Sequence, residues 1–162
     1  MTLSTAGSPA FSLGGRAAVA LLLGLLALPG CGESGLGPDV PDNNVVLEGN
    51  GDWGDDPYVA NSASVDGHGL TVEVGYSGGC RRHIFTLVIS ETFLESDPVQ
   101  LPAELVHEAN GDACERWVTD TRVFDLDLVR TRYQQFYGPG PGTVVLRVEG
   151  LSGEDLVYEF AG

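Results

Sequence analysis

Alternation of apolar and polar residues is the clearest pattern in the second half of the chain. In residues 70–76, LTVEVGY, every second side chain is apolar: Leu70, Val72, Val74 and Tyr76. A period of two residues is typical of a β-strand that buries one face. The same alternation returns in residues 143–148 and 156–160, so we expect these segments to be strands that also turn one face toward a core.

Other segments are rich in β-branched and aromatic residues, which favour strands. These predicted strands cover residues 58–65, 83–90, 99–109 and 116–126. Segment 83–90 is apolar on both faces, which suits the centre of a sheet. Pro102 lies inside segment 99–109 and fits most easily on an edge strand, because proline lacks the N–H that a ladder requires.

Turn signals separate these strands at intervals of about ten residues. Asn110-Gly111 is a two-residue turn signal between two strands and predicts a hairpin. The helical candidate is residues 128–136, and an apolar cluster at residues 45–47 is a candidate for one more short strand. The pattern predicts an all-β fold over residues 58–162: an antiparallel β-sandwich or small barrel of seven to eight strands with at most one short helix.

The N-terminal region has a different pattern. Arg16 precedes an apolar run at residues 17–28, which is short for a membrane span of ~20 residues and is typical of a secretory signal peptide. The run ends in Leu28-Pro29-Gly30-Cys31, which resembles a bacterial lipobox. This resemblance implies that residues 1–30 are a lipoprotein signal peptide and that Cys31 becomes an N-terminus carrying fatty acids such as palmitate.

The segment after Cys31 is rich in Gly, Pro, Asp, Asn and Glu up to residue 57. We expect residues 31–57 to be the acylated cysteine and a flexible acidic tether that reaches roughly 25–30 Å. Gly32 occupies the position where an Asp tends to retain enteric lipoproteins in the inner membrane, so the lipobox resemblance implies a lipid-anchored protein of the outer membrane, on either face.

Charge narrows the choice of partners. All 23 acidic residues follow Cys31, against seven of the eight arginines, and the chain has no lysine. So negative a surface argues against nucleic acid or an anionic membrane surface as a partner. The expected partners are the membrane, through the lipid on Cys31, and an unidentified protein or small ligand.

Two cysteines remain once Cys31 is assigned to the lipid. Cys80 and His83 lie in YSGGCRRH, where glycines allow the backbone to turn or to approach a neighbour closely. His107 and Cys114 flank the Asn110-Gly111 turn, and a hairpin there would place them opposite each other with Cβ atoms ~5 Å apart. The four side chains are therefore expected to lie close together.

Three interpretations of this constellation are open. Cys80 and Cys114 form a disulfide, which an exported compartment favours. Alternatively, Cys80, His83, His107 and Cys114 bind a metal, although the H-x6-C spacing departs from common zinc sites. The third is catalysis by His83 or His107 as a base near Asp112, which no nucleophile motif supports. We favour the disulfide and expect no catalytic residue, no metal and no cofactor.

The motifs SGGCxxH and HxxxxDxC, on a β-rich domain behind a lipobox, resemble uncharacterised secreted and lipid-anchored bacterial proteins of the NigD-like group. The resemblance covers residues 60–160 and marks five signature positions without an established activity: Cys80, His83, His107, Asp112 and Cys114. We expect a non-enzymatic lipoprotein with a binding or structural role in the envelope. The alternatives are a metal-binding protein or metal-dependent enzyme that uses His83 and His107, and an exported protease inhibitor.

Overall fold

The computed structural model describes residues 43–49, 51, 53–151 and 155–162. They belong to one compact unit, Gly37–Gly162, whereas the unit Met1–Leu36 lies outside the described residues. The predicted signal peptide, Cys31 and the first part of the predicted tether therefore lie outside them as well. In the part of the chain that is described, no helix is both long and apolar enough to cross a membrane.

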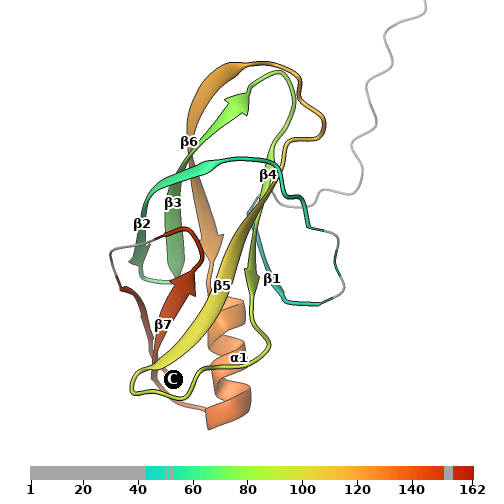
Figure 1. The fold of residues 1–162 in the computed structure, drawn as a ribbon. Coiled ribbons are helices and arrows are strands. Elements are labelled where there is room, and N and C mark those ends of the chain that lie inside the picture. The colour runs from blue at the N-terminus through green and yellow to red at the C-terminus, as the bar shows by residue number, and fades with distance from the viewer. Residues whose placement is uncertain (1–42, 50, 52, 152–154) are drawn as a thin grey trace, which may run out of the picture. The chain divides into compact units, whose positions relative to one another are not determined.

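The described residues form two β-sheets and one helix (Figure 1). The five-stranded sheet has the order β1 (Asn43–Leu47), β4 (Ile84–Ile89), β5 (Val99–Glu108), β7 (Gly142–Val148), β8 (Leu156–Phe160). The three-stranded sheet has the order β2 (Val59–Asp66), β3 (Gly69–Gly78), β6 (Arg116–Asp125). Helix α1 (Asp127–Tyr137) follows β6, one residue longer at each end than the sequence predicts.

The inner faces of both sheets contribute to one hydrophobic core, as in a β-sandwich. The apolar positions of the alternating segment in β3 are all buried, as are those of β8. Strand β4 is buried on both faces and lies between β1 and β5, so the central position predicted for it is confirmed. The all-β prediction is also confirmed, with eight strands in two open sheets among the described residues.

Two strand pairs are parallel, whereas the sequence analysis expected antiparallel pairing. Strand β1 runs parallel to β4, and β5 runs parallel to β7. A parallel pair needs a long crossover connection. The β2–β3 hairpin of the other sheet supplies the first crossover, and β6 with α1 supplies the second.

The hairpin predicted at Asn110-Gly111 is wrong, although the turn itself is present. Asn110 and Gly111 have φ of 53° and 63°, and the N–H of Asp112 donates to the carbonyl of Ala109 at 3.0 Å. Strand β5 already has β4 and β7 on its two edges, so β6 crosses to the other sheet and pairs with β3. His107 consequently lies opposite Phe85 of β4, not opposite a cysteine.

The edge position expected for Pro102 is also wrong, because β5 is a central strand. Pro102 pairs with Arg147 of β7, and its carbonyl accepts the N–H of Ser90, just past the end of β4. The N and O atoms of a strand residue face the same neighbour. The missing N–H of Pro102 thus faces the side where β4 has ended, and the ladder with β7 loses no bond.

The folded domain begins before residue 58. Residues of the predicted tether form β1, which pairs with β4 from Asn43↔Phe85 to Leu47↔Ile89. Residues 31–42 of that tether lie outside the described residues. The apolar cluster at residues 45–47 is therefore part of a sheet.

Candidate functional site

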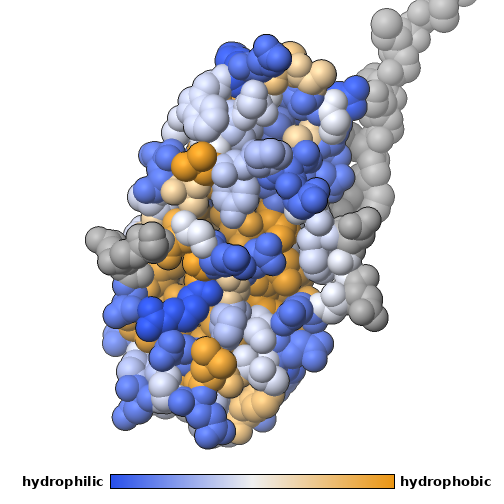
Figure 2. All heavy atoms as spheres, in the orientation of Figure 1, coloured by the Kyte–Doolittle hydropathy of each residue, from blue (hydrophilic) through white to orange (hydrophobic). Residues whose placement is uncertain are grey.

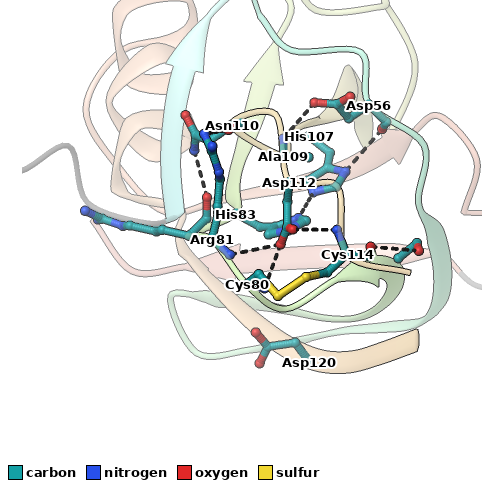
Figure 3. Close-up of polar contacts among 12 residues, drawn as sticks. Asp56, Cys80, Arg81, His83, His107, Ala109, Asn110, Asp112, Cys114 and Asp120 are labelled. Atoms are coloured by element: carbon teal, nitrogen blue, oxygen red, sulfur yellow. Dashed lines mark hydrogen bonds and ion pairs between the residues drawn. A yellow bond between two sulfur atoms is a disulfide. The ribbon is translucent and has the colours of Figure 1, made fainter. Parts of the chain in front are cut away.

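A disulfide joins Cys80 to Cys114 across 34 residues of sequence, with Cα atoms 6.0 Å apart (Figure 3). It ties the β3–β4 connection to the segment between β5 and β6. The disulfide predicted from the sequence is therefore present. Because both sulfurs are bonded to each other, neither is a thiolate, and the four-ligand metal site considered as an alternative does not form in this structure.

His83 and His107 meet because β4 and β5 are antiparallel neighbours. His83 immediately precedes β4, and His107 lies near the end of β5 opposite Phe85. Nδ1 of His83 is 2.8 Å from Nε2 of His107. The two residues are only 3% and 2% exposed.

Asp112 contacts the second ring nitrogen of His83, Nε2. Its Oδ2 atom accepts the backbone N–H groups of Cys80 at 2.8 Å and Arg81 at 2.9 Å, and lies 3.2 Å from Nε2 of His83. Its Oδ1 atom accepts the N–H of Cys114 at 2.9 Å. These donors, first among them the Cys114 N–H, hold the pKa of Asp112 well below its usual range, so the side chain is a carboxylate.

His107 contacts a residue that the sequence analysis missed. Its Nδ1 atom lies 3.2 Å from the backbone carbonyl of Asp56, and its own carbonyl accepts the Asp56 N–H at 3.0 Å. The Asp56 carboxylate accepts the N–H of Ala109 at 2.7 Å. Asp56 lies in the predicted tether, and its position just before the predicted strand 58–65 is the one sequence signal that could have suggested a folded role. We call Asp56, His83, His107 and Asp112 the His–Asp network.

Aromatic rings enclose the network. Tyr76 stacks on His83 and Phe85 stacks on His107, each with ring centroids 4.3 Å apart. Tyr58 meets His107 edge-on at 5.9 Å. This burial is the main reason that the pKa of His107 is lowered, because removal from water disfavours the charged imidazole.

Gly78 makes room for the network. It has a φ of 154°, and a Cβ atom at this position would lie 2.4 Å from Nε2 of His83 and 3.1 Å from Oδ2 of Asp112. At Gly79, with φ 99°, a Cβ atom would lie 2.5 Å from Nη2 of Arg116. The close approach expected for the glycines of YSGGCRRH is therefore present at both positions.

The arrangement can hold charge and protons, but it offers little access for catalysis. A general base must come within hydrogen-bond reach of the proton that it abstracts from a substrate. The polar atoms of His83 and His107 point at each other, at Asp112 and at a backbone carbonyl, between stacked aromatic rings. The network is built as an internal support that joins three chain segments: residues 55–57, 78–83 and 107–114.

A groove of about 680 Å³ opens beside the network, along β5. The described residues that line it include four acidic and two aromatic side chains and no arginine: Asp55, Asp56, Glu104, Glu149, Trp53 and Tyr58. The segment leading into β2 and the strand β5 lie toward the viewer in Figure 1, and the same face in Figure 2 has apolar surface in its middle with hydrophilic residues around it. The pKa of Tyr58 is raised, first by burial and then by Glu104 and Glu149, as expected where negative charges converge.

Comparisons by sequence find no matching family model and no matching curated protein. Solved structures do match the fold. A NigD-like immunity protein from Bacteroides caccae ATCC 43185 has a TM-score of 0.53 at 14% identity, over 74% of this chain and 63% of that one. A protein of unknown function, DUF1344, from Bacteroides vulgatus ATCC 8482 has a TM-score of 0.45 at 19% identity, over 74% of this chain and 56% of that one. A candidate lipoprotein from Bacteroides fragilis NCTC 9343 has a TM-score of 0.45 at 14% identity, over 74% of this chain and 70% of that one.

At these identities the likeness concerns the fold. The chain spans less than two thirds of the NigD-like immunity protein, whose fold it shares. The sequence motifs suggest a resemblance to the NigD-like group, and the fold of the β-sandwich is similar to that of one NigD-like protein.

Proposed function

We propose that this chain is a non-enzymatic lipoprotein of the bacterial envelope whose β-sandwich binds a protein partner. The observation that carries the proposal is the burial of the His–Asp network. His83 and His107, the two histidines of the Cys/His constellation, are buried and in hydrogen-bond contact with each other. The two cysteines of the constellation form a disulfide. These side chains stabilise the fold, so we assign the function of the protein to its exposed surface.

The anchor follows from the lipobox at Leu28-Pro29-Gly30-Cys31. A cysteine acylated with two or more chains binds a membrane stably, whereas one chain does not. The fold likeness to a NigD-like immunity protein supports a non-enzymatic role, and we place the protein at the outer membrane on the sequence grounds given above.

The groove along β5 is the surface that we assign to the partner. Four acidic and two aromatic side chains line it, and none of the described lining residues is an arginine. A protein segment with lysine or arginine side chains complements this charge, and the same cations are attracted to the faces of Trp53 and Tyr58. We therefore propose a basic peptide segment of another protein as the occupant.

A titration with peptides tests this assignment. The full chain in detergent is expected to bind an arginine- and lysine-rich peptide and not a glutamate-rich peptide of the same length. The double variant Glu104→Gln/Glu149→Gln should weaken binding by about two- to thirtyfold, as expected for two exposed charge pairs worth ~0.2–1 kcal/mol each.

The matched control is Glu95→Gln/Glu159→Gln, which removes the same charge at exposed positions that do not line the groove. This control should bind nearly as well as the unchanged protein. Equal losses in both double variants, or no binding of the basic peptide, would rule out the groove as the site.

A further inference from the structure

Three polar contacts follow one another through the His–Asp network. Oδ2 of Asp112 lies 3.2 Å from Nε2 of His83, and Nδ1 of His83 lies 2.8 Å from Nε2 of His107. Nδ1 of His107 then lies 3.2 Å from the carbonyl oxygen of Asp56. Each contact requires one proton between its two atoms, so the row requires three.

Neither end of the row can supply a proton. The carbonyl oxygen of Asp56 is an acceptor only. Asp112 already accepts three backbone N–H groups, two of them on Oδ2, the oxygen that faces His83. A proton on Oδ2 would point at these N–H groups, so Asp112 cannot donate to His83. All three protons must come from the ring nitrogens of His83 and His107, and two neutral imidazoles carry only two between them.

We infer that the His83–His107 pair holds three ring protons at neutral pH, so that the buried network is an ion pair between the Asp112 carboxylate and a histidine cation that shares its proton with a second histidine. The cation is His83, which donates from Nε2 to Asp112 and from Nδ1 to His107. His107 is neutral and donates from Nδ1 to Asp56. With only two protons, one of the three contacts would bring two lone pairs together.

Burial favours this distribution. His107 loses solvation on its stacked face against Phe85, and its pKa is lowered for that reason, which leaves the extra proton on His83. A buried charge is tolerated when a partner of opposite charge and further hydrogen bonds satisfy it. Asp112 supplies the opposite charge, and its side chain and that of His83 are each 1% exposed.

The other titratable and charged groups around the pair come from several elements. Tyr76 of β3 stacks on His83, and Tyr58 meets His107 edge-on. Arg122 of β6 lies over Phe85 with its Cζ atom 5.0 Å from the ring centroid, on a ring that itself stacks on His107.

The other charged groups near the His83–His107 pair come from the segments that connect the strands. The Asp56 carboxylate binds the Ala109 N–H, while Asp55 pairs with His107 through a backbone bridge. The Arg81 guanidinium donates to the carbonyl of Asn110 at 2.9 Å, and Arg82 precedes His83 in the chain. These contacts leave Asp112 as the carboxylate in direct contact with the His83 ring.

The extra proton links folding to pH. Histidine in the unfolded chain loses its proton above about pH 6.5, whereas the folded pair keeps one. The folded state then binds more protons than the unfolded state, so stability falls as the pH rises above neutral. The segments released when the proton leaves are those that the network joins: residues 78–83, 107–114 and 55–57.

The proton count can be measured directly in the unmodified full chain, labelled with ¹⁵N-histidine and dissolved in detergent. The chain has three histidines, so a long-range ¹H–¹⁵N spectrum is simple, and His68→Gln assigns the third. At pH 7 we expect three protonated nitrogens among the four of His83 and His107. Two protonated nitrogens would overturn the inference.

A second measurement uses stability as the readout. The slope of unfolding free energy against pH near pH 8 should correspond to about one more proton in the folded chain than in the unfolded chain. Asp112→Asn removes the negative charge that retains this proton, so that slope should fall toward zero. A slope near zero in the unchanged protein, or the same slope in both proteins, would contradict the inference.

Discussion

A Cβ atom on Gly78 would lie 2.4 Å from Nε2 of His83, the atom that faces Asp112. The backbone of β3 therefore passes against the His–Asp network at a point where any side chain would displace it. The disulfide, His83, its contact with Asp112 and the glycine all belong to YSGGCRRH and its contacts with the segment after β5.

Replacement of Gly78 tests this contact. Gly78→Ala should destabilise the protein, because the methyl group must push His83 away from Asp112. The control is Gly140→Ala, with a similar φ of 145° and no atom within 4 Å of the added Cβ, so it carries the backbone strain without the clash. In urea unfolding we expect Gly78→Ala to lose about 1–3 kcal/mol more than the control. Equal losses would show that the network tolerates the methyl group.

Removal of the disulfide should reduce stability without removing the fold. The loop between Cys80 and Cys114 spans 34 residues, for which the chain-entropy account gives about 3–4 kcal/mol. Asp112 accepts the N–H groups of both cysteines, so the two segments remain joined in Cys80→Ser/Cys114→Ser. Circular dichroism should show an unchanged strand signal, and urea unfolding should show the loss. Unchanged stability would contradict a formed disulfide.

The acid side of the pH profile should depend on Asp112. Its pKa is lowered in the folded state, so its contribution to stability is present above the unfolded value of about 3.9 and is lost as the pH falls below it. Thermal unfolding between pH 7 and pH 2 should therefore show a smaller decline in Tm for Asp112→Asn than for the unchanged protein. Asp66→Asn, at an exposed position, is the control and should keep the normal decline.

The lipid anchor has an independent test in Cys31→Ser. In bacteria grown with a labelled fatty acid, this variant should lose both the label and membrane retention, because position 31 then has no thiol to accept the diacylglyceryl group. Cys80→Ser/Cys114→Ser should keep both and is the matched control. A Cys31→Ser protein that still carries the label would exclude the lipobox assignment.

The sequence predicts local structure well where side-chain periodicity determines it. Residues 70–76 alternate because one face of β3 is buried, and Asn110-Gly111 forms a turn because both positions adopt a positive φ. The sheet to which each strand belongs depends on which edges are free. Strand β5 has neighbours on both edges, and no local signal reports that β6 must join β3.

The candidate site was also predictable only in part. The Cys80–Cys114 pair and its nearness to His83 follow from the motifs and the export signal. Asp56 carries no signal in the sequence beyond its position just before the predicted strand 58–65, because His107 contacts its backbone carbonyl, which any residue type offers. The pairing of the two histidines follows from the β4–β5 register, which the predicted hairpin obscured.

The central claim is that this constellation supports the fold and is not a metal or catalytic centre. Mass spectrometry of protease fragments from the non-reduced protein tests it most directly. We predict that the fragments containing Cys80 and Cys114 are joined, that they separate on reduction with a gain of two hydrogen masses, and that no metal accompanies the native chain. Two free thiols at Cys80 and Cys114, with one zinc ion bound per chain, would contradict this account.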